Sequence, residues 1–173
     1  MTQKNTPLIS TLHQLLDYDA SHFHCAEVLL EKSLHEWIKT TASQQLRKVI
    51  QRYQHYIHEH IETMDKFITD EQINSIAVSN RIMRAFVDDA NEKLSNCNDM
   101  PIRDACLLAC IQTINHYKIS AYGTAAAFAK TLGMEKHARA FHAAEVNEKQ
   151  IDDRLTQLAE FEINAKAKAP LLM

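Results

Sequence analysis

Residues 102–132 read IRDACLLACIQTINHYKISAYGTAAAFAKTL, and this stretch decides the fold. It contains no proline and one glycine, Gly123. Apolar residues recur in it at the three- and four-residue spacings of a buried helical face, namely Leu107, Leu108, Ile111, Ile114, Ile119 and Tyr122. The stretch therefore predicts one long helix, which Gly133 ends.

Two polar residues interrupt this apolar face. Asn115 and Lys118 lie about one turn apart, with apolar neighbours on both sides. Burying an unpaired amide costs about 2–7 kcal/mol, and an unpaired ammonium costs more. On an inward face, both side chains need partners from other helices.

The composition favours an all-α protein of one domain. The chain has 173 residues with only 2 glycines and 3 prolines, too few for the many turns of a β-rich fold. A net charge of −3 with interspersed signs gives no basic surface for nucleic acid. The first residues lack the apolar core of a signal peptide, and no apolar run approaches the roughly 20 residues that span a bilayer. We expect a cytoplasmic protein with no membrane segment, whose four cysteines are reduced thiols.

Three further long helices and one short helix follow from the apolar periodicity. The long helices are expected over residues 7–38, 43–68 and 135–161, and the short one over 80–94. The expected caps are Thr6 before Pro7, a Thr41–Gln44 capping box, and Asp99. Four long helices joined by a short, a long and a short connection have the connectivity of a ferritin-like bundle. The expected domain is 1–173, with a frayed tail from about residue 164.

Ligand-capable side chains lie near the middle of several of these helices. Glu27 falls on the apolar stripe of the first helix, and a carboxylate there must be paired, protonated or bound to a metal. In the second helix, the spacing of His55, His58 and Glu62 lets them face a common site, whereas His60 is expected to point elsewhere. The last long helix offers Glu148 and Asp152. Carboxylates and imidazoles of this kind suit iron, manganese or zinc.

The run from Ile102 to Ala159 resembles the second half of the YciE/YciF-type ferritin-like proteins, and is closest to the YciF branch. The motif that carries the resemblance is His116-Tyr117 followed by residues 120–124, SAYGT. Arg103-Asp104-Ala105 at the start of the helix, and Glu148-Lys149 followed by Asp152, add to it. The similarity extends over residues 12–163. It implies a bacterial stress-associated bundle, commonly a homodimer, with a metal site between the helices.

Position by position, the resemblance implies a reduced ligand set. Glu27, Glu148 and Asp152 match acids of the family, and His58 matches the histidine of a Glu-x-x-His motif. Three departures remove acids, because His55, Asn147 and the pair Asn115 and Lys118 stand where acids are expected. A two-metal centre of the ferroxidase type lacks bridging acids here.

Three functions remain open on the sequence alone. The first is a stress-associated protein that binds one divalent ion through Glu27, His55, His58, Glu148 and Asp152, a site lined by Asn115, Lys118 and Glu62. Three acids against one ammonium leave enough negative charge for one such ion. The second is a metal-free helical scaffold or interaction protein that acts through its surface. The third, a di-iron oxidase or peroxidase, is disfavoured by the ligand count. In each case, Lys118 is expected within salt-bridge reach of at least one of the three acids.

Overall fold

The computed structural model describes residues 8–74, 77 and 79–168, and every regular element within them is helical. The elements are α1 (Leu12–Thr40), α2 (Gln44–Asp70), α3 (Arg81–Ser95), α4 (Met100–Thr131), α5 (Glu135–Leu158), the π-helical turn η1 (Ala159–Ile163) and α6 (Asn164–Lys168). The prediction of an all-α fold is confirmed. None of the helices in the described residues is long and apolar enough to cross a membrane.

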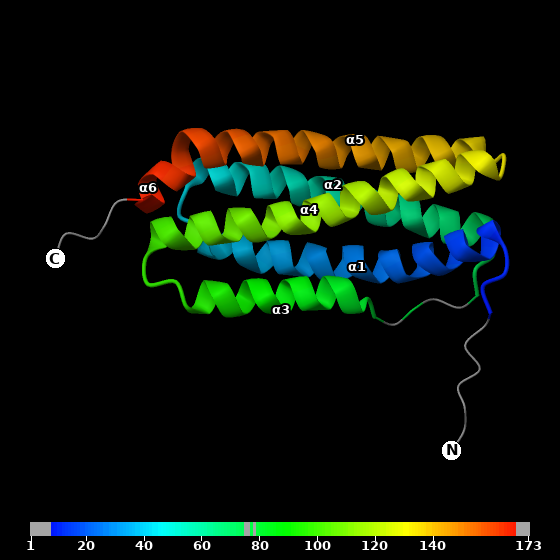
Figure 1. Cartoon of the computed structure of the whole chain (residues 1–173), viewed down its shortest axis with the longest axis horizontal. Coiled ribbons are helices and arrows are strands. Elements are labelled where there is room, and N and C mark those ends of the chain that lie inside the picture. The colour runs from blue at the N-terminus through cyan, green and yellow to red at the C-terminus, as the bar shows by residue number, and fades with distance from the viewer. Residues whose placement is uncertain (1–7, 75–76, 78, 169–173) are drawn as a thin grey trace, which may run out of the picture.

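The four long helices α1, α2, α4 and α5 form a bundle whose axes run nearly along one direction (Figure 1). Helix α4 packs on α5, α1 packs on α2, and α2 also contacts α5. The short helix α3 lies in the connection from α2 to α4 and covers part of α1 and α4. This is the predicted short, long, short order of connections.

Side-chain caps fix where the helices begin. Asp99 caps α4 as predicted, because its Oδ1 accepts a hydrogen bond from the N–H of Ile102 at 2.8 Å. The first helix begins later than expected, at Leu12, with Thr11 as its cap. The expected cap at Thr6 and Pro7 lies outside the described residues.

The cap of α2 differs from the predicted Thr41–Gln44 box. The hydroxyl of Thr41 donates back to the Trp37 carbonyl at 2.8 Å, so its side chain is directed toward the end of α1. Ser43 takes this role and accepts from the N–H of Leu46 at 3.2 Å. The carboxylate of Asp104 adds a tertiary cap, since it accepts from the N–H of Ser43 at 2.7 Å. No local pattern could show this contribution, because it comes from α4.

The C-terminal region is more helical than expected. Gly133 ends α4 with a φ of 74°, a conformation that glycine adopts without strain. After α5, the chain continues through η1 into α6 as far as Lys168, where a frayed tail is expected from the sequence. Residues 169–173 of that expected tail lie outside the described part.

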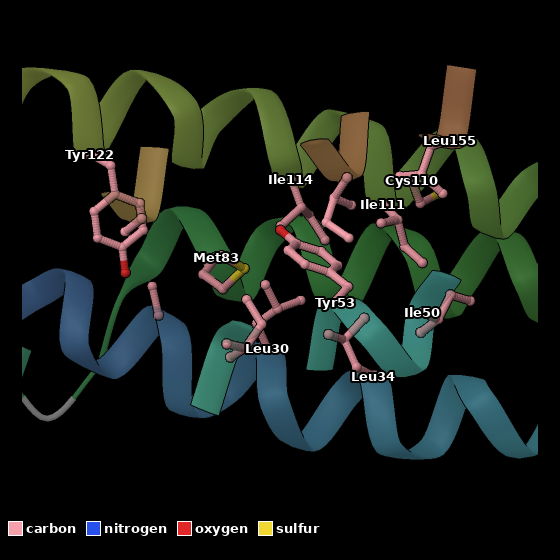
Figure 2. Close-up of a cluster of buried hydrophobic side chains, with 14 of the residues drawn as sticks. Leu30, Leu34, Ile50, Tyr53, Met83, Cys110, Ile111, Ile114, Tyr122 and Leu155 are labelled. Atoms are coloured by element: carbon pink, nitrogen blue, oxygen red, sulfur yellow. The ribbon is translucent and has the colours of Figure 1, made fainter. Parts of the chain in front are cut away.

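The core runs the length of the bundle, and α3 contributes to it. Met83 is fully buried and Val87 nearly so, as expected for residues that must be covered in the fold or at an interface. The indole N–H of Trp37 donates to Asn91 Oδ1 at 2.9 Å and joins α3 to α1. Figure 2 shows side chains from these helices meeting in one continuous apolar layer.

Candidate functional site

Four charged or ionisable side chains meet in the middle of the bundle, one from each long helix. They are Glu27 of α1, His60 of α2, Lys118 of α4 and Glu148 of α5. The histidine side chain is 2% exposed and the other three have no exposed surface. We call these four residues the central ion cluster. Each sits on its helix at the three- or four-residue spacing of the core, which places all four on the inward face.

Lys118 lies between the two carboxylates and bridges them. Its Nζ is 2.5 Å from Oε1 of Glu148 and 3.1 Å from Oε2 of Glu27. The prediction that Lys118 reaches at least one acid is confirmed. The ammonium also lies 4.8 Å from the ring centroid of Tyr53 and 5.9 Å from that of Tyr122, within range of cation–π attraction.

Two tyrosines and an amide bind the remaining carboxylate oxygens. The hydroxyl of Tyr122 donates to Glu27 Oε1 at 2.5 Å, and that of Tyr53 donates to Glu148 Oε2 at 2.7 Å. Figure 2 shows the two rings entering the core from α4 and α2. The amide of Asn115 donates to Glu148 Oε2 at 2.7 Å and to the Glu148 carbonyl at 3.0 Å. Both buried carboxylates are therefore partnered from several sides.

His60 completes the cluster from α2. Its Nδ1 lies 3.3 Å from Glu148 Oε1 and 3.8 Å from Glu27 Oε1. The ring packs edge-on against Tyr122 at a centroid distance of 5.0 Å. Two carboxylates, one ammonium and one imidazole thus lie together in the buried centre of the bundle.

The electrostatics of the cluster favour a charged glutamate and neutral tyrosines. Burial acts to raise the pKa of Glu148, but the Lys118 ammonium, followed by the neighbouring His60 imidazole, outweighs it, so this pKa lies below the ordinary 4.5. Burial, followed by the charge of the neighbouring glutamates, holds the pKa values of Tyr53 and Tyr122 well above 10.0. The two tyrosines therefore act as hydrogen-bond donors at neutral pH.

The histidines predicted from the second helix lie elsewhere. The side chains of His55 and His58 are 69% and 64% exposed, and Glu62 is similarly exposed. His58 pairs with Glu31 at 3.1 Å and not with Glu27. The expectation that His55, His58 and Glu62 face a common internal site is wrong.

The angular positions of these residues on α2 explain this error. The buried positions of α2 include Tyr53, Ile57, His60, Met64 and Phe67, which repeat at steps of four, three, four and three. His55 lies two residues from both Tyr53 and Ile57, which places it near the opposite side of the helix, and His58 follows the buried Ile57 by one residue. A shift of one residue turns a helical face by about 100°. The sequence did contain a signal for His60, because this residue continues the three- and four-residue spacing of Tyr53, Ile57, Met64 and Phe67.

Asp152 also lies outside the cluster. Its side chain is partly exposed and accepts from His116 Nε2 at 3.0 Å on the outer side of α4 and α5. It follows Glu148 by four residues, but the buried series of α5 continues through Ile151 and Leu155. The cluster therefore contains two acids, not the three expected from the sequence.

The residues of the cluster do not fit a divalent metal ion as they stand. In metal-binding bundles, carboxylates and imidazoles from facing helices converge on the ion. Here the ammonium of Lys118 takes the space between Glu27 and Glu148, and its charge repels a second cation beside it. In the part of the chain that the structure describes, no group of three His, Cys, Asp or Glu side chains is placed to hold a metal.

The fold and the cluster define a class of protein, an all-α, ferritin-like four-helix bundle with a buried ionic centre. Residues 11–168 match the family model described as a domain of unknown function, DUF892. Because this match spans most of the chain, the protein belongs to that family.

Relatives support the assignment. The chain is 29% identical over 161 residues to Protein YciF of Escherichia coli (strain K12), covering 92% of this chain and 97% of that protein. The crystal structure of the E. coli stress protein YciF matches with a TM-score of 0.82 at 28% identity, over 93% of this chain and all of the other. YcfI, a putative structural protein from Rhodopseudomonas palustris, matches with a TM-score of 0.82 at 22% identity, over 90% of this chain and 98% of that one, which shows the shared fold. The predicted YciF-type resemblance is confirmed.

Proposed function

We propose that this protein is a metal-independent helical scaffold that takes part in a bacterial stress response and acts through its surface. The observation that carries the proposal is the position of Lys118, whose ammonium bridges Glu27 and Glu148 with no exposed surface. The charge that a metal supplies in a ferritin-like centre is supplied here by a covalently attached cation. The centre thus serves to hold four helices in register.

Burial of the whole cluster supports the same proposal. A catalytic centre must admit its substrate, yet the four charged groups and both tyrosines are closed off from solvent. The association with stress rests on the E. coli relative YciF, which is described as a stress protein. We also propose that the protein is located in the cytoplasm.

Metal analysis tests the proposal directly. We expect protein purified without a chelator or metal-affinity tag to contain no stoichiometric iron, manganese or zinc. Added metal ions and EDTA should leave its melting temperature unchanged, because only ligands that bind the native state shift it. One tightly held ion per chain would instead support the single-metal alternative and overturn the scaffold proposal.

A variant with a restored acid provides the positive control. Lys118→Glu removes the internal cation and adds an oxygen ligand beside Glu27 and Glu148. We expect this variant to melt at a higher temperature with added Fe²⁺, Mn²⁺ or Zn²⁺, which the parent does not. If the variant gained no metal-dependent stability, the idea that Lys118 stands in place of a metal would be wrong.

We also propose that the scaffold is a homodimer. Helix α3 covers only part of the face formed by α1 and α4, and the remainder is a groove of about 1190 Å³. Tyr18 and Ile82 border this groove and are 40% and 52% exposed, and small residues of α4, such as Ala121 and Ala125, line it. Exposed apolar surface of this kind marks association sites.

Light scattering coupled to gel filtration tests the dimer. We expect twice the 19.8 kDa chain mass for the parent. Ala125→Glu introduces a charge into the groove and should give monomers, because an unpaired charge is costly to bury. Ala127→Glu is the matched control, since Ala127 is exposed on the same helix and outside the groove. A monomeric parent would contradict the dimer but leave the metal proposal standing.

A further inference from the structure

Lys118 and Glu27 place an amine against a carboxyl group in the buried centre of the bundle. Nζ of Lys118 lies 3.1 Å from Oε2 of Glu27, and neither side chain has any exposed surface. The two oxygens of Glu27 have different surroundings. Oε1 accepts a hydrogen bond from the hydroxyl of Tyr122 at 2.5 Å, whereas Oε2 accepts none from the residues that the structure describes. An attacking amine thus meets one carboxyl oxygen held by a donor and another that is able to leave.

Glu148 provides the base that such an amine requires. A lysine attacks a carboxyl carbon only as the neutral amine, so its ammonium has to lose protons first. Oε1 of Glu148 accepts from Nζ of Lys118 at 2.5 Å, which is within reach for proton transfer. Glu148 is ionised at neutral pH and can accept a proton. Nucleophile, base and carboxyl group therefore meet at one nitrogen atom.

The closed core favours a neutral product over an ion pair. Burial disfavours the charged forms of both an amine and a carboxyl group, so a proton moves between them more readily than in water. An amide leaves two fewer charges to be kept out of water. The fold also holds the reacting groups in contact, which replaces an encounter in solution by a reaction within one molecule.

We propose that Lys118 and Glu27 condense, after the chain has folded, into an intramolecular amide bond. One ammonium proton passes to Oε2 of Glu27, and the neutral amine attacks the carboxyl carbon while Glu148 takes a second proton from nitrogen. The hydroxyl of Tyr122 stabilises the negative charge that develops on Oε1. Glu148 then returns its proton to Oε2, the C–Oε2 bond breaks, and one water molecule leaves. No electrons are exchanged, and Glu148 is regenerated.

The amide bond goes beyond the scaffold role, because it would tie α1 covalently to α4. The ion pair between Lys118 and Glu27 is the starting state, and the amide accumulates slowly from it. A cross-link between distant residues restricts the unfolded chain and so stabilises the folded one. Glu148 and His60 remain next to each other after the reaction.

Intact mass spectrometry tests the proposal on the full, unmodified chain. The purified protein is kept folded at neutral pH for several days, and samples are denatured and weighed at intervals. We expect a growing fraction that is lighter by the mass of one water molecule. A mass that does not change would overturn the proposal. Metal content is measured separately, so this result does not depend on the metal-independent role proposed above.

Peptide mapping then locates the bond. Trypsin does not cleave after an acylated lysine, so Lys118 should stay within peptide 104–130 instead of ending peptide 104–118. Glu27 lies in peptide 5–32, and we expect this peptide to be joined to 104–130. A link to peptide 140–149, which carries Glu148, would overturn the assignment to Glu27.

Three variants separate this reaction from other losses of water. Lys118→Arg keeps the positive charge but has no amine, so the loss of water should disappear. Lys130→Arg, at an exposed position of the same helix, is the matched control and should keep it. Tyr122→Phe should slow the reaction about 10²–10³-fold, as expected when one donor to a developing oxyanion is removed.

Circular dichroism establishes that each variant is folded, and mapping of the parent chain decides the question even where a variant is not. A loss of water that survives in folded Lys118→Arg would overturn the proposal. An unchanged rate in folded Tyr122→Phe would equally contradict the role of the Tyr122 hydroxyl.

Discussion

Removal of the Lys118 ammonium should destabilise the protein strongly. The change Lys118→Met keeps most of the side-chain volume and deletes the charge that lies between Glu27 and Glu148. Breaking a fully buried ion pair by removing one partner costs about 3–5 kcal/mol, because the remaining charge is left uncompensated. For a chain of this size, each kcal/mol corresponds to about 2–4 °C in melting temperature. We therefore expect a decrease of roughly 6–20 °C at pH 7.

Thermal unfolding followed by circular dichroism measures this loss, and its pH dependence identifies the cause. Without the ammonium, the folded state raises the carboxylate pKa values, so the penalty is present above the raised pKa. It disappears as the pH falls toward the unfolded value of about 4.3. The difference between parent and variant should therefore shrink on acidification.

Two further variants separate charge from packing. Lys130→Met, an exposed position at the end of the same helix, should change the free energy of unfolding by less than about 0.5 kcal/mol. Adding Glu27→Gln and Glu148→Gln to Lys118→Met removes all three charges and should recover much of the loss. If Lys118→Met cost no more than Lys130→Met at every pH, the bridging role of Lys118 would be refuted.

Three other predictions concern His60, the two tyrosines beside the central ion cluster, and the Asp104 cap of α2. His60→Leu should lower the free energy of unfolding by about 2–4 kcal/mol, because it removes a buried partner of the carboxylates. His55→Leu, on the exposed face, should lower it by less than about 0.5 kcal/mol, and urea titration compares the two variants. Folding raises the pKa values of Tyr53 and Tyr122. The stability that these two tyrosines contribute is therefore complete below pH 10.0 and is lost as the pH rises toward their pKa values in the folded state. Stability should then decrease by about 1.4 kcal/mol per pH unit for each tyrosine, and Tyr→Phe variants should remove that slope in alkaline urea titrations. Asp104→Ala removes the tertiary cap of α2 and should lower the free energy of unfolding, measured by urea titration, by about 1–3 kcal/mol. An unchanged free energy of unfolding would show that the cap contributes little.

The sequence by itself determined the class of fold and part of the cluster. Scarce glycine and proline, together with long apolar periods, allow only long helices, and the order of connection lengths allows few ways to pack four of them. Glu27 and Lys118 could also be identified, because each interrupts an otherwise apolar stripe. A charged residue on such a stripe needs a partner, whatever the details of packing.

The tertiary structure alone decided which side chains meet. Periodicity locates the inward face of a helix to within about one residue, and one residue is about 100° of rotation. The bundle does not depend on such details, but the identity of its buried histidine does: His60 is buried, whereas His55 and His58 are exposed. The structure also places Asp152 on the outer side of the bundle, so that the Lys118 ammonium faces only two acids, Glu27 and Glu148. The balance of charge at the centre depends on these rotations, because Coulomb energy in a buried site changes steeply over a few ångströms.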